Sequence, residues 1–243
     1  MKSFTFAKRN TKELIRDPLN IAFGIGFPVV LLLLLSAIQR SIPVSLFEIQ
    51  TIAPGIVVFG LSFMTLFSAT IIAKDRKSSL LQRLYTSPMK PYDFILGYTL
   101  PIIIISVIQS IVCYVFAIIL GLEFSVNILY SILFLIPIAI FYIALGLLCG
   151  SLFTDKQVGG ICGALLTNVS AWLSGIWFDL ELVGGVFREI AYLLPFVHAV
   201  NMQRAVLIGD FSNIFVDLLW VLGYGIVLLV MSILVFLKQM KKQ

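Results

Sequence analysis

Charged residues are scarce in this sequence. Only 12% of its 243 residues are Asp, Glu, Lys or Arg, whereas 60% are apolar, and the mean hydropathy is +1.07. Soluble domains carry about twice that share of charge, which helps to cover a surface that faces water. The composition therefore excludes an ordinary soluble domain and predicts an integral membrane protein.

Residues that usually carry catalysis or bind metals are also few. His198 is the single histidine, and Cys113, Cys149 and Cys162 stand far apart inside apolar runs. The sequence contains no C-x-x-C pair, no G-x-S-x-G nucleophile motif and no G-x-x-x-x-G-K-[ST] phosphate loop. We therefore expect no catalytic residue, no metal site and no cofactor bound by this chain.

Long apolar runs dominate the sequence instead. A helix needs about 20 apolar residues to cross the roughly 30 Å hydrocarbon core of a membrane. Six runs qualify and none alternates with period two, so we predict an all-α membrane protein with one domain over residues 1–243. The predicted spans are 21–38, 52–73, 94–120, 128–153, 157–177 and 213–237.

The remaining parts of this single domain are short. Residues 1–20 precede the spans, residues 21–177 hold spans one to five and a loop at 74–93, residues 178–212 form an external segment, and residues 213–243 hold the last span and the tail.

Basic residues lie mostly on one side of these spans. Of the 17 Lys and Arg residues, 14 precede the first span, follow the last span, lie in the loop at 74–93 or are Lys156. The three exceptions are Arg40, Arg188 and Arg204. Basic residues are enriched in cytoplasmic loops, so both termini are predicted to be cytoplasmic. The net charge of +5 then favours binding to anionic lipid, and nucleic acid is not needed to explain it.

Residues 3–19 have the pattern of an amphipathic helix ahead of the first span. Helical spacing brings together Phe4, Ala7, Thr11, Leu14 and Ile15. The basic residues of the rest of the helix are Lys8, Arg9, Lys12 and Arg16. We expect this helix to lie in the cytoplasmic headgroup layer, and a solvated basic tail is the alternative.

The loop at 74–93 is the longest on the cytoplasmic side and has a pattern of its own. Its apolar residues Leu80, Leu81, Leu84 and Tyr85 recur at helical spacing before Pro88. This spacing predicts a short helix whose apolar edge binds a protein partner.

The same loop resembles the coupling-helix signature of type-2 ABC transporter permeases, E-R-x-x-G-T-L-E-R-L-x-x-T-P. The residues in matching register are Asp75, Arg76, Leu81, Arg83, Leu84, Ser87 and Pro88. The sequence departs from the signature at Asp75, Ser79, Leu80 and Gln82. The basic N-terminal segment, which ends in Arg-Asp-Pro at residue 18, is similar to the interface helix of that family.

This resemblance implies a function. The chain would be a permease subunit in the cell membrane that forms half of an ABC exporter in the drug- and antibiotic-export subgroup. Its substrate would be an amphiphilic drug, antibiotic, peptide or lipid-like molecule. Its partners would be a separate ATP-binding cassette subunit, which binds ATP and magnesium, and a second permease, either a copy of this chain or a sister chain.

A stand-alone secondary transporter or channel is the alternative function. Such proteins commonly carry ionisable groups inside their spans or consist of inverted repeats. This sequence places no charged residue deep in a predicted span and has no visible repeat between its halves. An intramembrane enzyme is a weaker alternative, because the sequence lacks a cluster of acid, base and nucleophile groups.

The external segment at 178–212 holds two apolar runs, each too short to span a membrane. In the resembling family this region is a re-entrant helical hairpin, matched here by Pro195 and Arg204 after the Ser174-Gly175 pair. His198 has two interpretations, a proton-linked switch or an interfacial histidine without a special role.

Small polar residues recur on single faces of spans two and five. The candidate pathway-lining residues are Ser62, Thr65, Thr167, Asn168, Ser170 and Ser174. Hydrogen bonding within the helix packing is the alternative interpretation. Gly146-x-x-x-Gly150 and Gly159-x-x-x-Gly163 both have the spacing that permits close helix approach.

Overall fold

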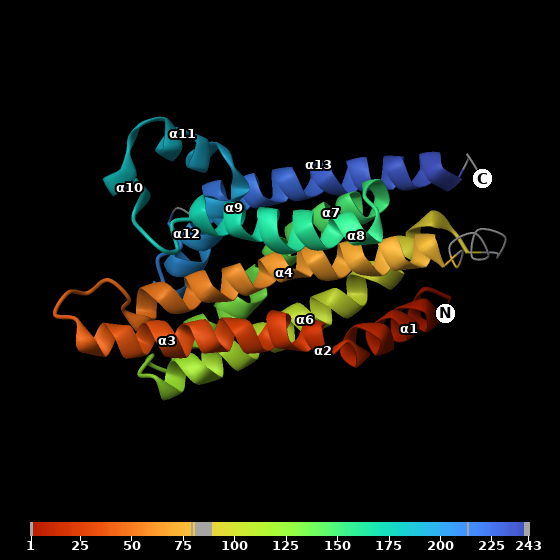
Figure 1. Cartoon of the computed structure of the whole chain (residues 1–243). Helices are drawn as coiled ribbons and strands as arrows, with labels where there is room; N and C mark the ends of the chain where they lie inside the picture. Colours follow the sequence, from red (N-terminus) through yellow and green to blue (C-terminus); the bar gives the residue numbers. More distant parts are fainter. Residues whose placement is uncertain (1, 79, 81–88, 213, 241–243) are drawn as a thin grey trace.

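The computed structural model describes residues 2–78, 80, 89–212 and 214–240, and that part of the chain is helical without any strand. The long helices lie side by side in an elongated bundle (Figure 1). The elements are α1 (Lys2–Arg16), α2 (Pro18–Ile21), the π-helix η1 (Ala22–Gly26), α3 (Phe27–Ser41), α4 (Ile49–Lys77), α6 (Pro91–Ile119), α7 (Val126–Leu152), α8 (Asp155–Val158), the π-helix η2 (Gly159–Leu166), α9 (Thr167–Trp172), α10 (Leu180–Val183), α11 (Gly185–Leu193), α12 (Pro195–Ile208) and α13 (Ile214–Met240).

Five helical stretches are long and apolar enough to cross a membrane. They agree with five of the six predicted spans, and every boundary lies within a few residues of the predicted one. The stretches are Pro18–Ser41, Ile49–Lys77, Tyr92–Ile119, Val126–Leu152 and Ile214–Lys238.

The span predicted at 157–177 is not confirmed. Residues 155–172 are continuously helical as α8, η2 and α9, but the segment begins with three polar residues, Asp155, Lys156 and Gln157, and ends at Trp172. The apolar part that remains is shorter than the about 20 residues that a straight span needs. The chain bends after Trp172, where the sequence pattern predicted a further turn of helix.

The two ends of the bundle differ in what they carry. The N-terminal helix α1, the last turn of α4 and the C-terminal end of α13 lie at one end, whereas α10, α11 and the connections after α3 and α6 lie at the other (Figure 1). The segment from α8 to α9 packs along α4 and returns the chain from the first end to the second.

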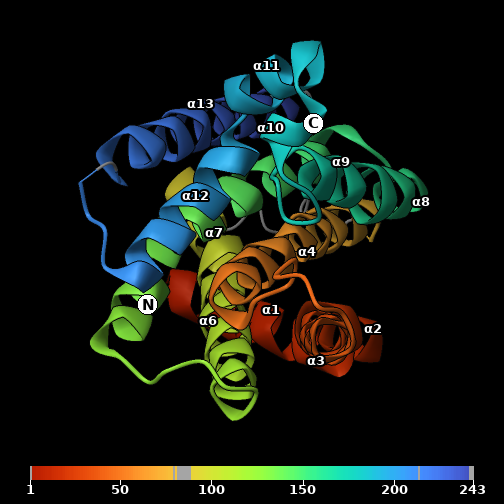
Figure 2. The same ribbon diagram turned by 90° about the vertical axis from the view of Figure 1, so that its left-hand side faces the viewer.

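Helix α4 lies at the centre of the bundle. Along its apolar part 89% of the residues are buried, and it packs against α3, α6, α7, α9 and α12. An end-on view shows α4 surrounded by these helices, with α12 crossing the bundle obliquely (Figure 2). Helix α12 is largely buried, although the sequence predicted it as part of an external segment.

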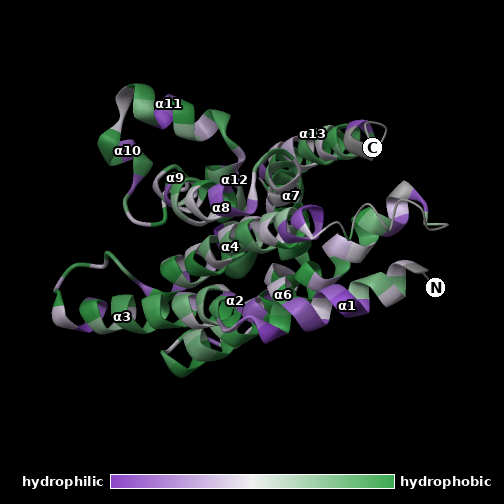
Figure 3. Ribbon diagram, turned by 45° about the vertical axis from the view of Figure 1, so that its right-hand side comes forward, coloured by the Kyte–Doolittle hydropathy of each residue, from purple (hydrophilic) through white to green (hydrophobic). Residues whose placement is uncertain are grey.

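The hydropathy of the residues differs between the long helices and α1. The long helices are coloured mostly hydrophobic along their length, whereas α1 carries hydrophilic turns (Figure 3). Exposed apolar side chains are numerous on α3 and α13, among them Val30, Leu34, Leu219 and Leu234. Such a surface is the one that lipid or another apolar chain would cover.

The contact between α4 and α7 depends on two glycines. A Cβ atom at Gly150 would lie 2.6 Å from the backbone oxygen of Ala69, and one at Gly146 would overlap Ser68 and the backbone of Thr65. By contrast, a Cβ atom at Gly159 would meet nothing within 4 Å. The first of the two small-residue motifs therefore permits close helix packing, and Gly159 of the second does not take part in it.

We expect Gly150→Ala to lower the free energy of unfolding by about 1–3 kcal/mol, because the added methyl group must push two backbones apart. Gly159→Ala is the matched control and should be neutral or slightly stabilising, because alanine favours helix and has room there. Thermal unfolding of the purified protein in detergent measures both. Equal stability of the two variants would contradict this packing.

Candidate functional site

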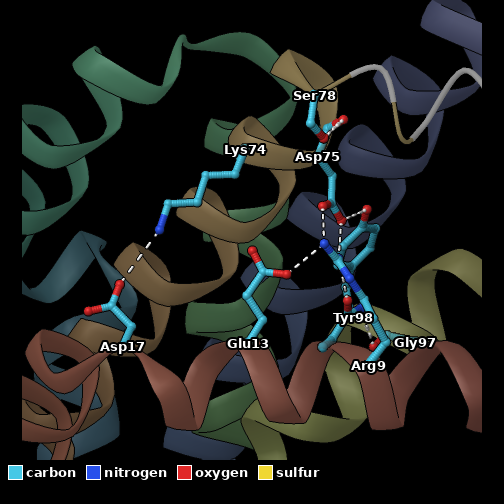
Figure 4. A network of polar contacts seen from close by, with 9 residues as sticks. Arg9, Glu13, Asp17, Lys74, Asp75, Ser78, Gly97 and Tyr98 are labelled. Atoms are coloured by element: carbon cyan, nitrogen blue, oxygen red, sulfur yellow. Dashed lines mark hydrogen bonds and ion pairs between the residues drawn. The ribbon is translucent and has the colours of Figure 1, made fainter.

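A buried carboxylate lies near the end of α4. Asp75 is 1% exposed and lies at the start of the segment 74–93 that the sequence singled out, whose first residues are the last turn of α4. The Arg9 guanidinium on α1 donates two hydrogen bonds of 2.7 Å, one to each carboxylate oxygen. The hydroxyl of Tyr98 on α6 donates a third, at 2.9 Å (Figure 4). The carboxylate therefore joins three helices that are distant in sequence.

The charges around Arg9 favour its ionised form. Partial burial lowers the pKa of the Arg9 guanidinium, but the hydrogen bonds and charge of Asp75, with smaller contributions from Glu13 and Tyr98, together raise it above its ordinary value. Glu13 lies one turn along α1, 2.5 Å from the guanidinium. A bidentate pair of this kind is stronger and more directional than a bond between neutral groups.

Helix α1 is also fastened to the start of α6. Asn10 is fully buried, and its side-chain amide donates to the backbone oxygen of Gly97 at 2.9 Å. Phe6 packs edge-on against Tyr98 with ring centroids 4.9 Å apart, and it occupies the space that a side chain at position 97 would need. The hydroxyl of Ser3 donates to Asp93 in the first turn of α6.

A second arginine ties the same end of α4 to α7. Arg76 donates to the backbone oxygens of Gly150 at 2.8 Å and Phe153 at 3.2 Å, which lie at the end of α7. Weaker ion pairs of 3.6 Å join Lys74 to Asp17 and Lys77 to Asp155. The last turn of α4 is thus connected to α1, α6, α7 and α8.

Of the predicted coupling residues, Asp75 and Arg76 are therefore found in this network. The others lie outside the residues that the structure describes, and their contact with a partner stays a prediction. They are Leu81, Arg83, Leu84, Ser87 and Pro88.

The predicted amphipathic helix is present as α1, but its apolar residues divide between two surroundings. Ala7 and Leu14 are buried in the bundle, whereas Phe4 and Ile15 are exposed. The basic residues divide as well: Arg9 turns toward Asp75, and the other predicted members are exposed. Those exposed residues are Lys8, Lys12 and Arg16.

The predicted pathway residues are mostly occupied in packing. Thr65 donates to the backbone oxygen of Tyr142 at 3.0 Å, and Ser170 lies 2.6 Å from the Tyr142 hydroxyl. Ser62, Thr167 and Ser174 are buried and donate to backbone oxygens near them in sequence. Asn168 is the one exposed member of the set. A pathway role for any of them stays a prediction.

At the opposite end of the bundle, the predicted external residues stabilise α12. Pro195 occupies the first turn of this helix, where the missing backbone N–H of a proline costs no hydrogen bond. Arg204 donates to the backbone oxygens of Thr51 at 3.2 Å and Gly175 at 3.0 Å, and so joins α12 to the start of α4 and to the turn after α9.

His198 bridges three helices. Its Nδ1 lies 2.6 Å from a carboxylate oxygen of Asp217 on α13, and its Nε2 lies 2.9 Å from the backbone oxygen of Tyr192 on α11. The ring also stacks on Trp220 at 5.0 Å with an interplanar angle of 2°. These contacts give the histidine a structural role between α11, α12 and α13, which the sequence did not reveal.

The sequence analysis also missed several buried polar residues. Gln203 on α12 bonds to Ser131 on α7, which in turn lies 2.6 Å from the Tyr114 hydroxyl on α6. For Asn10 a signal existed, because it falls between Phe6 and Leu14 at intervals of four residues. A polar side chain inside the apolar stripe of a helix indicates a specific buried partner.

Metal binding finds no support in the described part of the chain, where no three His, Cys, Asp or Glu residues gather. The three cysteines are unpaired and buried.

We expect Arg9→Ala to lower the free energy of unfolding by about 1–3 kcal/mol, because it leaves the buried Asp75 carboxylate with fewer donors. Lys12→Ala is the matched control: this exposed lysine lies one turn along the same helix and should be neutral. Adding Asp75→Asn to Arg9→Ala should recover part of the loss. Additive losses in this thermal-unfolding cycle would contradict a direct pairing.

Comparison with known proteins agrees with this architecture. Residues 44–234, which hold four of the five apolar helices, match the family model described as ABC-2 family transporter protein. No curated protein matches the chain at a significant level. The match covers well over half of the sequence, so the chain belongs to the ABC-2 transporter family and is a multi-pass membrane permease of an ABC transporter.

Proposed function

We propose that this permease forms half of an exporter in the cell membrane and is driven by a separate ATP-binding cassette subunit that carries ATP and magnesium. A second permease, a copy or a sister chain, completes the pathway. The cargo is an amphiphilic drug, antibiotic, peptide or lipid-like molecule, in keeping with the short external connections and the apolar helices.

The observation that carries the coupling role is the network around Asp75. The loop that follows α4 is the proposed docking site for the ATPase, and the last turn of α4, which leads into it, is bonded to α1, α6 and α7 through Asp75 and Arg76. A movement of this loop would therefore move several helices together. Without these bonds, the same movement would shift the end of α4 alone.

The proposed topology has six spans with both termini in the cytoplasm. It rests on the basic residues that cluster in α1 and around the last turn of α4, and on the position of α1 and the C-terminal end of α13 at one end of the bundle. The segment 155–172, together with the turn that follows it, would be the fifth span in chain order and would bring the number of spans to six. The exposed residues of α1, among them Lys8 and Lys12, would lie against the cytoplasmic headgroups. Helices α11 and α12 form the proposed re-entrant hairpin.

Cysteine labelling in sealed cells tests this topology. A membrane-impermeant thiol reagent should modify Glu181→Cys on α10 and should leave Arg83→Cys unmodified until the cells are opened. The native cysteines are buried, which keeps the background low. Outside labelling at position 83 would reverse or refute the orientation.

Changing Leu81 and Leu84 together to Asp tests coupling. Burial of two leucines in a partner contributes about 3–5 kcal/mol, so this variant should lose co-purification of the ATPase and substrate-stimulated ATP hydrolysis. The matched control changes Leu182 and Val183 on α10 to Asp, which adds the same charge to exposed positions at the other end. Its complex should remain intact.

Full export and ATPase activity in the Leu81/Leu84 variant would overturn the coupling role. Transport by the purified permease in vesicles without any ATPase would favour a stand-alone transporter instead.

A further inference from the structure

A small cavity with polar and apolar lining residues lies at the end of the bundle opposite α1, between the end of α3, the start of α4 and the end of α6. Its volume is about 290 Å³. No part of the coupling network reaches it. The residues that line it are Ser36, Gln39, Arg40, Phe47, Glu48, Ile49, Gln50 and Leu120.

One buried polar group that lines this cavity is unsatisfied. Ser36 is 8% exposed, and its hydroxyl has no hydrogen-bond partner in the structure. Serines in helices ordinarily bond to a backbone oxygen one turn earlier, as Ser106 and Ser110 do here. A buried hydroxyl that lacks this bond indicates that something else binds it.

Two opposite charges line the same cavity without pairing. Neither Arg40 nor Glu48 takes part in any ion pair or side-chain hydrogen bond of the described chain. Glu48 also occupies the N-cap position of α4, yet its carboxylate does not cap the helix. The space between the two charged groups therefore suits a ligand that carries both charges.

Hydrogen bonds of the Gln39 side chain fix the α3–α4 connection, which forms one wall of the cavity. The Gln39 side chain donates to the backbone oxygen of Val44 at 2.8 Å and accepts from the backbone nitrogen of Phe47 at 2.5 Å. These bonds fix the connection between α3 and α4. Val44 and Leu46 on that connection are more than half exposed and offer an apolar surface beside the opening.

From this arrangement we propose that the cavity binds a zwitterionic phosphoethanolamine group, supplied by a membrane phospholipid. Arg40 binds the phosphate, for which a guanidinium is well suited, and Glu48 accepts hydrogen bonds from the primary ammonium. Ser36 lies one turn deeper and bonds to the oxygens that join headgroup and acyl chains. The acyl chains lie along the exposed apolar residues of the connection and of α3.

The depth of the cavity supports a lipid as the source. The apolar stretch of α3 ends at Ser41, so Arg40 and Glu48 lie at the level where a span meets the headgroups. A headgroup at this level needs no movement into the hydrocarbon core. The proposal does not depend on transport direction or on the ATPase, because it concerns the isolated chain.

Native mass spectrometry of the full-length chain in detergent tests the proposal, with short-chain phosphatidylethanolamine, phosphatidylcholine and phosphatidylglycerol as probes. Phosphatidylethanolamine should bind most tightly, because phosphatidylcholine has no N–H donor for Glu48 and phosphatidylglycerol has no ammonium. Arg40→Ala and Glu48→Gln should each weaken its binding by roughly tenfold, the scale of one hydrogen bond to a charged group. Glu189→Gln, an exposed control on α11, should leave it unchanged.

Two further measurements complete the test. Ser36→Ala should weaken phosphatidylethanolamine binding without loss of thermal stability, since the hydroxyl makes no bond in the protein. Glycerophosphoethanolamine without acyl chains should bind much more weakly, and equal binding would overturn the lipid as the source. Equal affinity for the three phospholipids, or no effect of Arg40→Ala and Glu48→Gln, would overturn the site itself.

Discussion

Pairing of the Asp75 carboxylate with Arg9 is the contact on which the organisation of the end of the bundle that carries α1 depends. A carboxylate that is almost fully buried near the end of a span is unfavourable unless donors replace the water it has lost. Arg9 and Tyr98 supply those donors from α1 and α6. Because the buried carboxylate needs the donors of Arg9, the N-terminal helix α1 packs against the bundle.

The same principle operates through the interior. Helices gain little from apolar burial when lipid already surrounds them, so close packing and polar bonds between helices become the means of association. Here Thr65 and Ser68 on α4 bond to backbone oxygens of α7, where Gly146 and Gly150 permit the close approach. These bonds explain why the hydroxyls of Thr65 and Ser68 are buried between α4 and α7.

The two ends of the molecule use arginine differently. At one end, Arg9 and Arg76 join the last turn of α4 to its neighbours. At the other, Arg204 fixes α12 against α4, while Arg40 lines a cavity without a partner of its own. Arg9, Arg76 and Arg204 hold neighbouring helices together. Arg40 is instead a candidate for binding a ligand.

The amino-acid sequence by itself determined the membrane class, five of the helical spans and the N-terminal amphipathic helix, because apolar length and periodicity act locally. The coupling role that a family resemblance gave to the loop at 74–93 stays a prediction, because most of that loop lies outside the described residues. The partners of Asp75, His198 and Arg204 were decided only by the tertiary structure, since each partner lies on another helix and no spacing encodes it. The segment 155–172 fell short of its predicted length because its polar first turn and the bend after Trp172 outweighed an apolar composition. The unpaired charges of Arg40 and Glu48 likewise became visible only when folding placed them around one cavity.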